Sequence, residues 1–434
     1  MDHDGLDELA RAYVRLGLRL GHVVPELVDA HLGDPALARA VAAEPRFDPL
    51  SLRAEAEALR RRLPATGRRA EYLDAQLAAC AVVAARAGGE PVGFVAEVRG
   101  CLGVDVAPGH EDDYDAAHAH LADVLGVPRR RLPAAVAAFR ERDRVPHEDL
   151  LAGVTTMLGA LRAATAEAVG LPAGEQLDVE VVADVPWAGF SRRVGRARSV
   201  MQVAREAGHR WSHLPLLVAH EAYPGHHTET ARLEGAVEPE RTLLLARTPR
   251  SLVAEGAAEL GLDAVVGPGW GPWATAHLAA AGLGGGTAPG ALGEAVEAAM
   301  DPLAAVRQDA ALLVHTSSAA DREDRALDHL TRWLLVDDAR ARRMLGFLAH
   351  PRWRIHTTTY VEGVRVVRPW LAARPPGETV GRRFARLLDE TWTPAALRRE
   401  AAGSGAAPTG GCGAPFSGER YPRHADDTPM SPTA

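Results

Sequence analysis

Apolar residues recur at helical spacing along most of the chain. In the segment 6–32 they repeat every three or four positions, which is the pattern of an amphipathic helix that faces a core. The residues that form this stripe are Leu6, Leu9, Ala10, Tyr13, Leu16 and Leu20. The same pattern recurs in 50–63, 70–87, 114–125, 133–142 and 148–169, and short breaks with Pro or Gly separate the segments. The chain is therefore predicted to be all-α.

Alternating patterns typical of β-strands are scarce. The clearest is 177–182, with the sequence LDVEVV, which predicts at most one short strand. From residue 403 onward the chain turns to Gly, Ser, Pro and Thr, a composition typical of disorder. We therefore expect one large helical domain over 1–402 and a disordered tail over 403–434.

Composition narrows the classes of protein. The 434 residues carry a formal charge of −8, and mild acidity disfavours a nucleic-acid partner. No run approaches the ~18–20 apolar residues that span a bilayer, so no membrane partner is expected. The three cysteines form no C-x-x-C pair, which favours a reducing, cytoplasmic location. Because the chain contains no lysine and all 49 basic residues are arginine, an arginine cluster alone is weak evidence of function.

One segment, 214–229, carries the signature of metal chemistry. An apolar run leads into His220-Glu221, and Pro224-Gly225-His226-His227 follows. In the zinc motif H-E-x-x-H, two histidines one helical turn apart bind the metal, and the Glu activates the zinc-bound water. Here the position four residues after His220 is Pro224, so the strict motif is broken.

A distorted helix restores the geometry of that motif. On a straight helix, a histidine at i+6 lies about a third of a turn off the face of His220, and one at i+7 lies about 10 Å along the axis. Pro224-Gly225 is where a helix is expected to distort, and a two-residue bulge there returns His226 to the place of the second ligand. We predict that His220 and His226 are ligands and that Glu221 is the general base. His227 is the alternative ligand.

Catalytic zinc usually has three protein ligands and a water molecule. Glu255 lies in an apolar, small-residue segment, where an unpaired carboxylate would be costly, and it is the candidate third ligand. Next to it, Gly256 and Ala257 would let a neighbouring helix approach closely. Glu259, one turn later, is a candidate to orient a ligand histidine from behind, although a surface carboxylate fits equally well. The predicted cofactor is Zn²⁺, with another divalent transition metal as the alternative.

These residues resemble a known family. The run HEAYPGHH at 220–227, followed by EGA at 255–257, is similar to the bacterial domain-of-unknown-function 885 family, whose members carry H-E-x-x-P-G-H-H and a downstream E-G-W-A. The first motif matches throughout, whereas Ala257 replaces the tryptophan of the second. The family's fold is similar to that of Taq-type zinc metallocarboxypeptidases, which implies a helical fold with a deep groove that holds the metal. The segment 358–363 resembles its C-terminal Tyr-x-x-Gly element.

The motif and the resemblance together predict a zinc-dependent, carboxypeptidase-like hydrolase of peptide (amide) bonds, with a peptide or small amide as substrate. Tyr360 is the candidate donor to the developing oxyanion, and His356 shares its helix face one turn earlier. Arg352 or Arg354 could pair with a free carboxylate of the substrate. Two alternatives stay open: a metal-dependent amidohydrolase of a non-peptide metabolite, and a helical protein that has lost activity and binds a partner.

Overall fold

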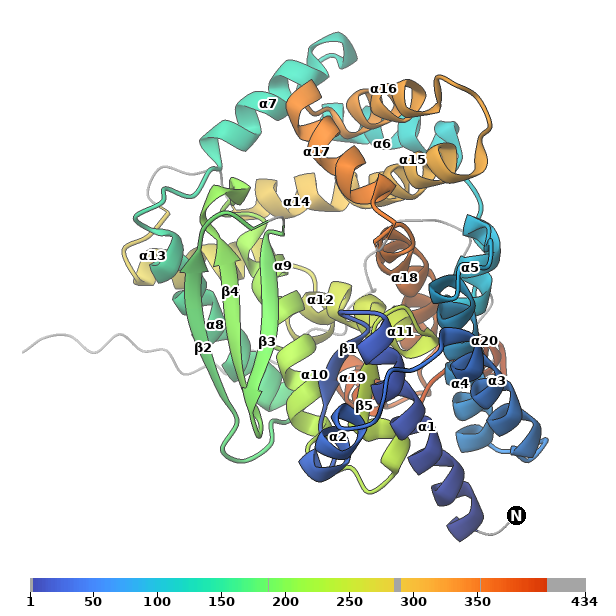
Figure 1. Ribbon diagram of the computed structural model, residues 1–434. Helices are drawn as coiled ribbons and strands as arrows, with labels where there is room; N and C mark the ends of the chain where they lie inside the picture. Colours follow the sequence, from blue (N-terminus) through green and yellow to red (C-terminus); the bar gives the residue numbers. More distant parts are fainter. Residues whose placement is uncertain (1–2, 186, 285–289, 352, 404–434) are drawn as a thin grey trace, which may run out of the picture.

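The computed structural model describes residues 3–185, 187–284, 290–351 and 353–403 and confirms a mainly helical fold with small β elements (Figure 1). The helices of the first half are α1 (His3–Val23), α2 (Pro35–Ala42), α3 (Pro49–Arg62), α4 (Arg68–Ala87), α5 (Phe94–Leu102), α6 (Glu111–Val124), α7 (Leu132–Arg142), α8 (Leu150–Ala168) and α9 (Leu214–Glu221). Those of the second half are α10 (His226–Leu233), α11 (Pro249–Glu259), α12 (Gly261–Val265), α13 (Trp270–Ala280), α14 (Gly290–Met300), α15 (Ala305–Thr316), α16 (Arg322–Leu334), α17 (Asp338–Ala349), α18 (His356–Ala372), α19 (Val380–Asp389) and α20 (Pro394–Gly403). Gly403 closes α20, and the rest of the predicted tail, 404–434, lies outside the described residues.

The first helix ends before the end of the predicted segment 6–32. α1 ends at Val23, and Pro25 follows, which cannot continue a helix because it lacks a backbone donor. Residues 28–31 instead form strand β1 (Val28–His31), which pairs antiparallel with β5 (Leu243–Leu245). The expectation of helix up to residue 32 is therefore wrong over its last part, because pairing with a distant segment decides the structure there.

A three-stranded sheet covers one side of the molecule. It consists of β2 (Gln176–Val182), β3 (Gly189–Gly195) and β4 (Arg198–Ala204) in the order β2-β4-β3. β2 runs parallel to β4, and β3 runs antiparallel to it. The predicted strand at 177–182 is present, but two further strands extend it into a sheet. In Figure 1 the sheet stands beside α8, and α9 and α10 lie between it and α11.

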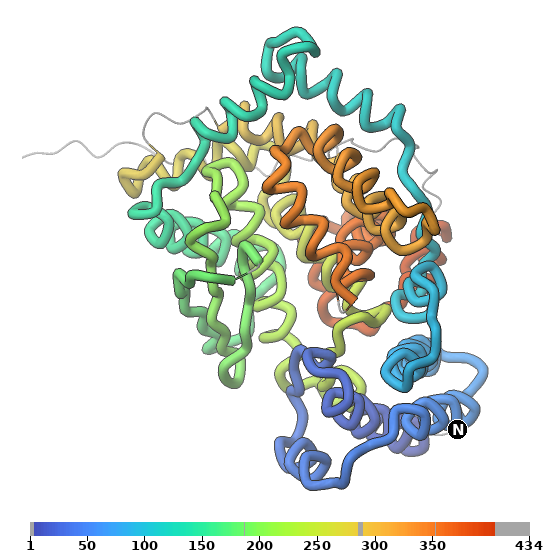
Figure 2. Tube along the Cα trace, turned by 45° about the horizontal axis from the view of Figure 1, so that its top comes forward, coloured from blue at the N-terminus to red at the C-terminus, as the bar shows by residue number. Residues whose placement is uncertain are grey.

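Three groups of buried apolar side chains hold the helices together. The largest lies among α1, α3, α4, α5, α11, α15, α16 and α18. A second lies between β4 and the helices α8, α9 and α13, and a third joins α6, α7 and α14. Figure 2 shows α6 and α7 as an arch above the orange helices α16 and α17. No helix among the described residues has the length and apolarity that crossing a membrane requires.

Two glycines bring the central helices α11 and α18 together. A Cβ atom on Gly256 would lie 2.4 Å from the carbonyl carbon of Gly363, and one on Gly363 would lie 2.5 Å from the carbonyl oxygen of Leu252. Any larger residue would force the helices apart. Because Glu255 precedes Gly256 and Tyr360 lies one turn before Gly363, this contact sets the distance between two of the candidate site residues.

Candidate metal centre

The helix is interrupted between α9 and α10, at the centre of the motif. α9 ends at Glu221 and α10 begins at His226, with a cis peptide bond between Tyr223 and Pro224. A Cβ atom on Gly225 would lie 1.8 Å from the carbonyl oxygen of His220, so only glycine fits there. The change in the chain is therefore larger than the two-residue bulge that the spacing suggested: the helix stops, turns and restarts.

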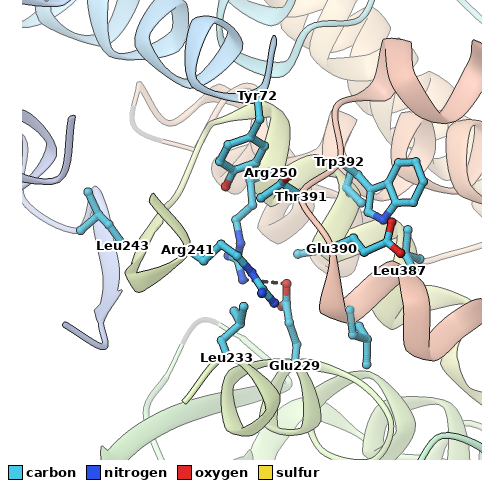
Figure 3. Close-up of a pocket in the computed structure, with 13 residues that line it drawn as sticks. Tyr72, Glu229, Leu233, Arg241, Leu243, Arg250, Leu387, Glu390, Thr391 and Trp392 are labelled. Carbon is cyan, nitrogen blue, oxygen red and sulfur yellow. Dashed lines mark ion pairs between the residues drawn. The ribbon is translucent and has the colours of Figure 1, made fainter. Parts of the chain in front are cut away.

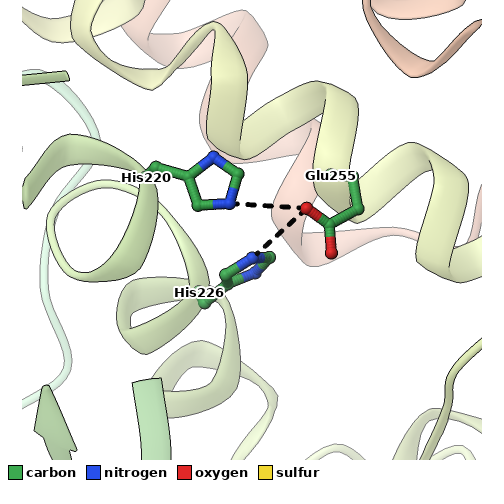
Figure 4. A group of neighbouring side chains, drawn as sticks. All are labelled: His220, His226 and Glu255. Atoms are coloured by element: carbon green, nitrogen blue, oxygen red, sulfur yellow. Dashed lines mark ion pairs between the residues drawn. The ribbon is translucent and has the colours of Figure 1, made fainter. Parts of the chain in front are cut away.

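The break brings His220 and His226 to the same point as Glu255 of α11 (Figure 4). Nε2 of His220 lies 3.4 Å from Oε2 of Glu255, and Nε2 of His226 lies 3.6 Å from the same oxygen. One ligand atom from each of the three residues lies within 4.8 Å of the others. The side chains keep exposed fractions of 14%, 26% and 14%, so the centre is enclosed by protein but reached by solvent.

The donor set fits a divalent transition metal. Oε2 of Glu255 is buried and has no hydrogen-bond partner of suitable geometry, although two imidazole nitrogens face it. In a tetrahedral site with bonds of about 2.0–2.2 Å, neighbouring ligand atoms are separated by roughly 3.3–3.6 Å. The two nitrogen–oxygen distances have this size, and the chemistry of two imidazoles and one carboxylate suits zinc.

Mutual charge interactions dominate the electrostatics of the cluster. Burial alone would lower the pKa of His220, but the carboxylates of Glu255 and Glu259 raise it well above its usual value. Burial would likewise raise the pKa of Glu255, but His226 and His220 lower it well below the ordinary range. Oε1 of Glu259 lies 3.4 Å from Nδ1 of His220, on the side of the ring away from Glu255. Glu259 therefore lies where an orienting carboxylate is needed.

His227 points away from this cluster. Its Nε2 lies 2.9 Å from Oε2 of Glu175 and its Nδ1 lies 2.9 Å from Oγ of Ser199, so both ring nitrogens are engaged. The side chain is 1% exposed, and burial lowers its pKa. Glu175 also accepts a hydrogen bond from the hydroxyl of Tyr223. The alternative ligand of the sequence analysis is therefore held in a separate buried network.

Glu221 is the last residue of α9 and is buried. Gly189, the first residue of β3, lies against it: a Cβ atom there would approach Cγ of Glu221 to 3.1 Å and Oε1 to 3.4 Å. The Glu221 carboxylate helps to raise the pKa of both His220 and His226. It is thus a charged neighbour of the cluster with a fixed position beneath the edge of the sheet.

Tyr360 faces the cluster from α18. Its ring centroid lies 6.0 Å from that of His220, and its hydroxyl lies 2.9 Å from Nε2 of His356. Burial raises the pKa of Tyr360 well above its usual value, and Glu255 and Glu259 raise it further. The phenol therefore keeps its proton at neutral pH and can donate a hydrogen bond.

The two arginines suggested for substrate binding do not line the cluster together. Arg354 is paired with the buried Glu97 of α5, and its Nη2 donates to the carbonyl oxygen of Val92 at 2.8 Å. Arg352 lies outside the described residues. No sequence motif singles out Arg307 of α15, which interacts electrostatically with Glu259 and Tyr360. Because every basic residue of this chain is an arginine, residue type does not distinguish Arg307 from the others. Only its position on α15 relative to the site does so.

An ion pair joins α10 and α11, two of the three helices that carry the proposed ligands. Arg250 in the first turn of α11 lies 2.7 Å from Glu229 of α10, at a cavity that Tyr72 and Arg241 also line (Figure 3). Because His226 and Glu255 belong to the same two helices, this contact helps to fix their separation. Glu229 and Arg250 carried no recognisable signal in the sequence.

Comparisons with known proteins add little. No protein-family model matches the sequence, and no curated protein matches it. A solved structure described as the "putative lipoprotein from Colwellia psychrerythraea" is 14% identical, covers 93% of this chain and 76% of its own, and has a TM-score of 0.49. A likeness at that level carries no argument about fold or function.

Proposed function

We propose that this chain is a zinc-dependent, carboxypeptidase-like hydrolase of peptide (amide) bonds. The observation that carries the proposal is the convergence of His220, His226 and Glu255, with Glu221 and Tyr360 on adjacent sides. The family resemblance supports it through the motif residues alone. A cytoplasmic location stays a prediction, to which the buried thiols of Cys80 and Cys101 are suited.

The three ligands would hold the ion, and Glu259 would fix the ring of His220. When bound, zinc polarises a carbonyl group and lowers the pKa of water towards about 7. Another divalent transition metal with the same preference for nitrogen and oxygen could take its place. The packing of α9, α10 and α11 would keep the three ligands close to one another.

Glu221 would act as the general base. Its carboxylate would accept a proton from the attacking water and pass it to the departing amine. It is suited to this task because it is buried beside the ligands and yet is not one of the three converging groups. The edge of β3 at Gly189 would hold it in place.

Tyr360 would stabilise the carbonyl oxygen as negative charge develops there. Its phenol is protonated and lies across the cluster from α9, and a single donor of this kind contributes about 2.7–4 kcal/mol in comparable sites. Nε2 of His356 would hold the hydroxyl in position. His356 is therefore a positioning residue in this account.

A metal analysis paired with a peptide screen tests the proposal. The full chain, purified after zinc is supplied, should contain about one zinc per chain and should cleave members of a peptide library. Glu221→Gln should keep the zinc and lose cleavage. A chain that binds no zinc, or a Glu221→Gln variant that cleaves at the wild-type rate, would contradict it.

A further inference from the structure

Buried carboxylates in the described part of the chain nearly all face a basic side chain. An arginine or histidine nitrogen lies beside each of Glu97, Glu175, Glu240, Asp309 and Glu362. The two buried carboxylates without such a partner are Glu221 and Asp143. A buried charge without a partner is costly. At Glu221 the proposed metal centre accounts for the exception, but Asp143 lies elsewhere.

Asp143 follows the last residue of α7 and is only 2% exposed. The backbone N–H of Ser212 donates to its Oδ2 at 3.2 Å, and the hydroxyl of Ser212 donates to the same oxygen. No residue that the structure describes donates a hydrogen bond to Oδ1. Burial raises the pKa of Asp143, and Arg210, which lowers it in part, is already paired with Glu297 at 2.6 Å. The carboxylate therefore has no cation of its own.

This carboxylate lines a cavity at the start of α9. The cavity lies among α13, α14 and the segment that precedes α9, and it contains about 550 Å³ of space free of atoms, its mouth included. Trp211, Trp270 and Leu278 form much of its apolar wall, and both tryptophans are 6% exposed. The backbone N–H of Trp211 donates to the carbonyl oxygen of Asp143 at 2.8 Å. Among the described residues that line the cavity, Asp143 is the one with a charged side chain.

Close backbone contacts set the spacing of the walls. A Cβ atom on Gly271 of α13 would lie 2.1 Å from the carbonyl oxygen of Gly290 in α14, and one on Gly293 would lie 2.7 Å from Cβ of Ser212. α14 therefore touches both α13 and the segment that holds Asp143. The metal centre is at the other end of α9, a helix of eight residues that is about 12 Å long. The cavity is thus separate from the cluster of His220, His226 and Glu255.

A buried carboxylate beside aromatic rings favours a cationic ligand. An ammonium group would give Oδ1 of Asp143 a charged hydrogen-bond donor, and the faces of indole rings attract cations. A neutral or anionic ligand would leave the carboxylate without a counter-ion. The size of the cavity limits the ligand to a small molecule.

We propose that the cavity at the start of α9 binds a small organic amine, with its ammonium group at Asp143 and its apolar part against Trp211 and Trp270. The amine site does not depend on the proposed hydrolysis, because none of these residues belongs to the metal centre.

Calorimetric titration of the full chain with 2-phenylethylamine, in zinc-loaded and in chelator-treated form, tests the proposal. One molecule per chain should bind, with the same affinity in both forms. 2-Phenylethanol has the same ring and chain but no charge. It should bind at least tenfold more weakly, because hydrogen bonds to charged groups are about twice as strong as neutral ones.

Two substitutions separate the charge from the apolar wall. Asp143→Asn preserves the shape of the side chain and should weaken binding of 2-phenylethylamine at least tenfold. The same variant should bind 2-phenylethanol as the wild type does, which also shows that the cavity is intact. Trp270→Leu should weaken the binding of both compounds by a similar factor. Asp338→Asn, which changes an exposed carboxylate on α17, is the matched control and should alter neither affinity.

Failure of 2-phenylethylamine to bind at millimolar concentration would overturn the proposal, as would equally tight binding of 2-phenylethanol. An unchanged affinity for the amine in Asp143→Asn, or an equal loss in Asp338→Asn, would also contradict it. Binding to the zinc-loaded form alone would place the amine at the metal centre instead of the cavity. If the amine binds as expected but no peptide is cleaved, the proposed function fails and the amine site stands.

Discussion

His226 and His227 are neighbours in sequence but lie in opposite environments. The ring of His226 is 26% exposed and faces a carboxylate oxygen at 3.6 Å, without a well-formed hydrogen bond. His227 is 1% exposed, and both its nitrogens lie 2.9 Å from oxygen partners. Each histidine is associated with one glutamate, Glu255 for the first and Glu175 for the second.

The two groups differ in whether their buried polar atoms have hydrogen-bond partners. The network of His227, Glu175, Ser199 and Tyr223 satisfies its members, as a buried polar group that serves stability should. The cluster of His220, His226 and Glu255 leaves an oxygen buried and unsatisfied, and such an atom is costly unless something else binds there. Both groups contain histidine and glutamate, so residue type does not tell them apart in this chain. The candidate metal centre differs from the structural network in its nitrogen–oxygen distances and in having a buried oxygen without a hydrogen-bond partner.

Removal of His226 should have the largest effect on function. With one of the three ligands gone, His226→Ala should lose its bound zinc and all measurable hydrolysis, because catalytic zinc needs three protein ligands. The fold should persist, since the side chain is part of a solvent-reached cluster. Zinc content by atomic absorption and the far-UV circular dichroism spectrum check both points.

Replacement of the proposed base should rank second. Glu221→Gln preserves shape and should reduce kcat by about 10²–10⁴-fold, the usual contribution of general base catalysis. Zinc binding should remain, because Glu221 is not among the converging ligands. Steady-state kinetics beside zinc analysis would distinguish this outcome from loss of the metal, which would make Glu221 a ligand instead.

Glu259→Gln should have an intermediate effect. The carboxylate lies 3.4 Å from Nδ1 of His220, and removing such a partner typically costs 10–100-fold in metal affinity or activity. Competition with a chromogenic chelator measures the affinity. Glu323→Gln on the exposed surface of α16 is a control of the same chemistry, and an equal loss there would show that Glu259 has no special role.

His227→Ala should affect function least and stability most. It removes one partner of the buried Glu175, and we expect the free energy of unfolding to fall by about 1–3 kcal/mol. Zinc affinity should not change. Urea denaturation of the chelator-treated protein measures the first, and a zinc titration of the folded variant measures the second. Loss of zinc from a folded His227→Ala variant would break the distinction between the two histidines.

The helical part of the fold follows from local pattern. The stripe at 50–63 became α3, and Asp48 accepts a hydrogen bond from the backbone of Ser51 at its start. Strand β1 was missed because its partner, β5, lies more than 200 residues away and the apolar spacing of α1 runs on into it. Local spacing cannot report such a pairing.

The candidate site also has one part that was predictable from the sequence and one part that was not. The Pro-Gly pair made a break before His226 predictable from the spacing of one motif, although the restart of the helix depends on the tight contact of Gly225 with His220. The choice between Arg354 and Arg307 was not predictable. It depends on the carboxylate that packing puts beside each one, which is Glu97 for Arg354.

X-ray absorption spectroscopy at the zinc edge of the zinc-loaded full chain identifies the ligands of the metal. We expect two imidazole ligands and a shell of nitrogen and oxygen atoms at about 2.0–2.2 Å. His227→Ala should leave the spectrum unchanged, whereas His226→Ala should abolish it. A third imidazole in the spectrum, or a spectrum that changes with His227 and not with His226, would contradict the claim that His220, His226 and Glu255 form the metal centre.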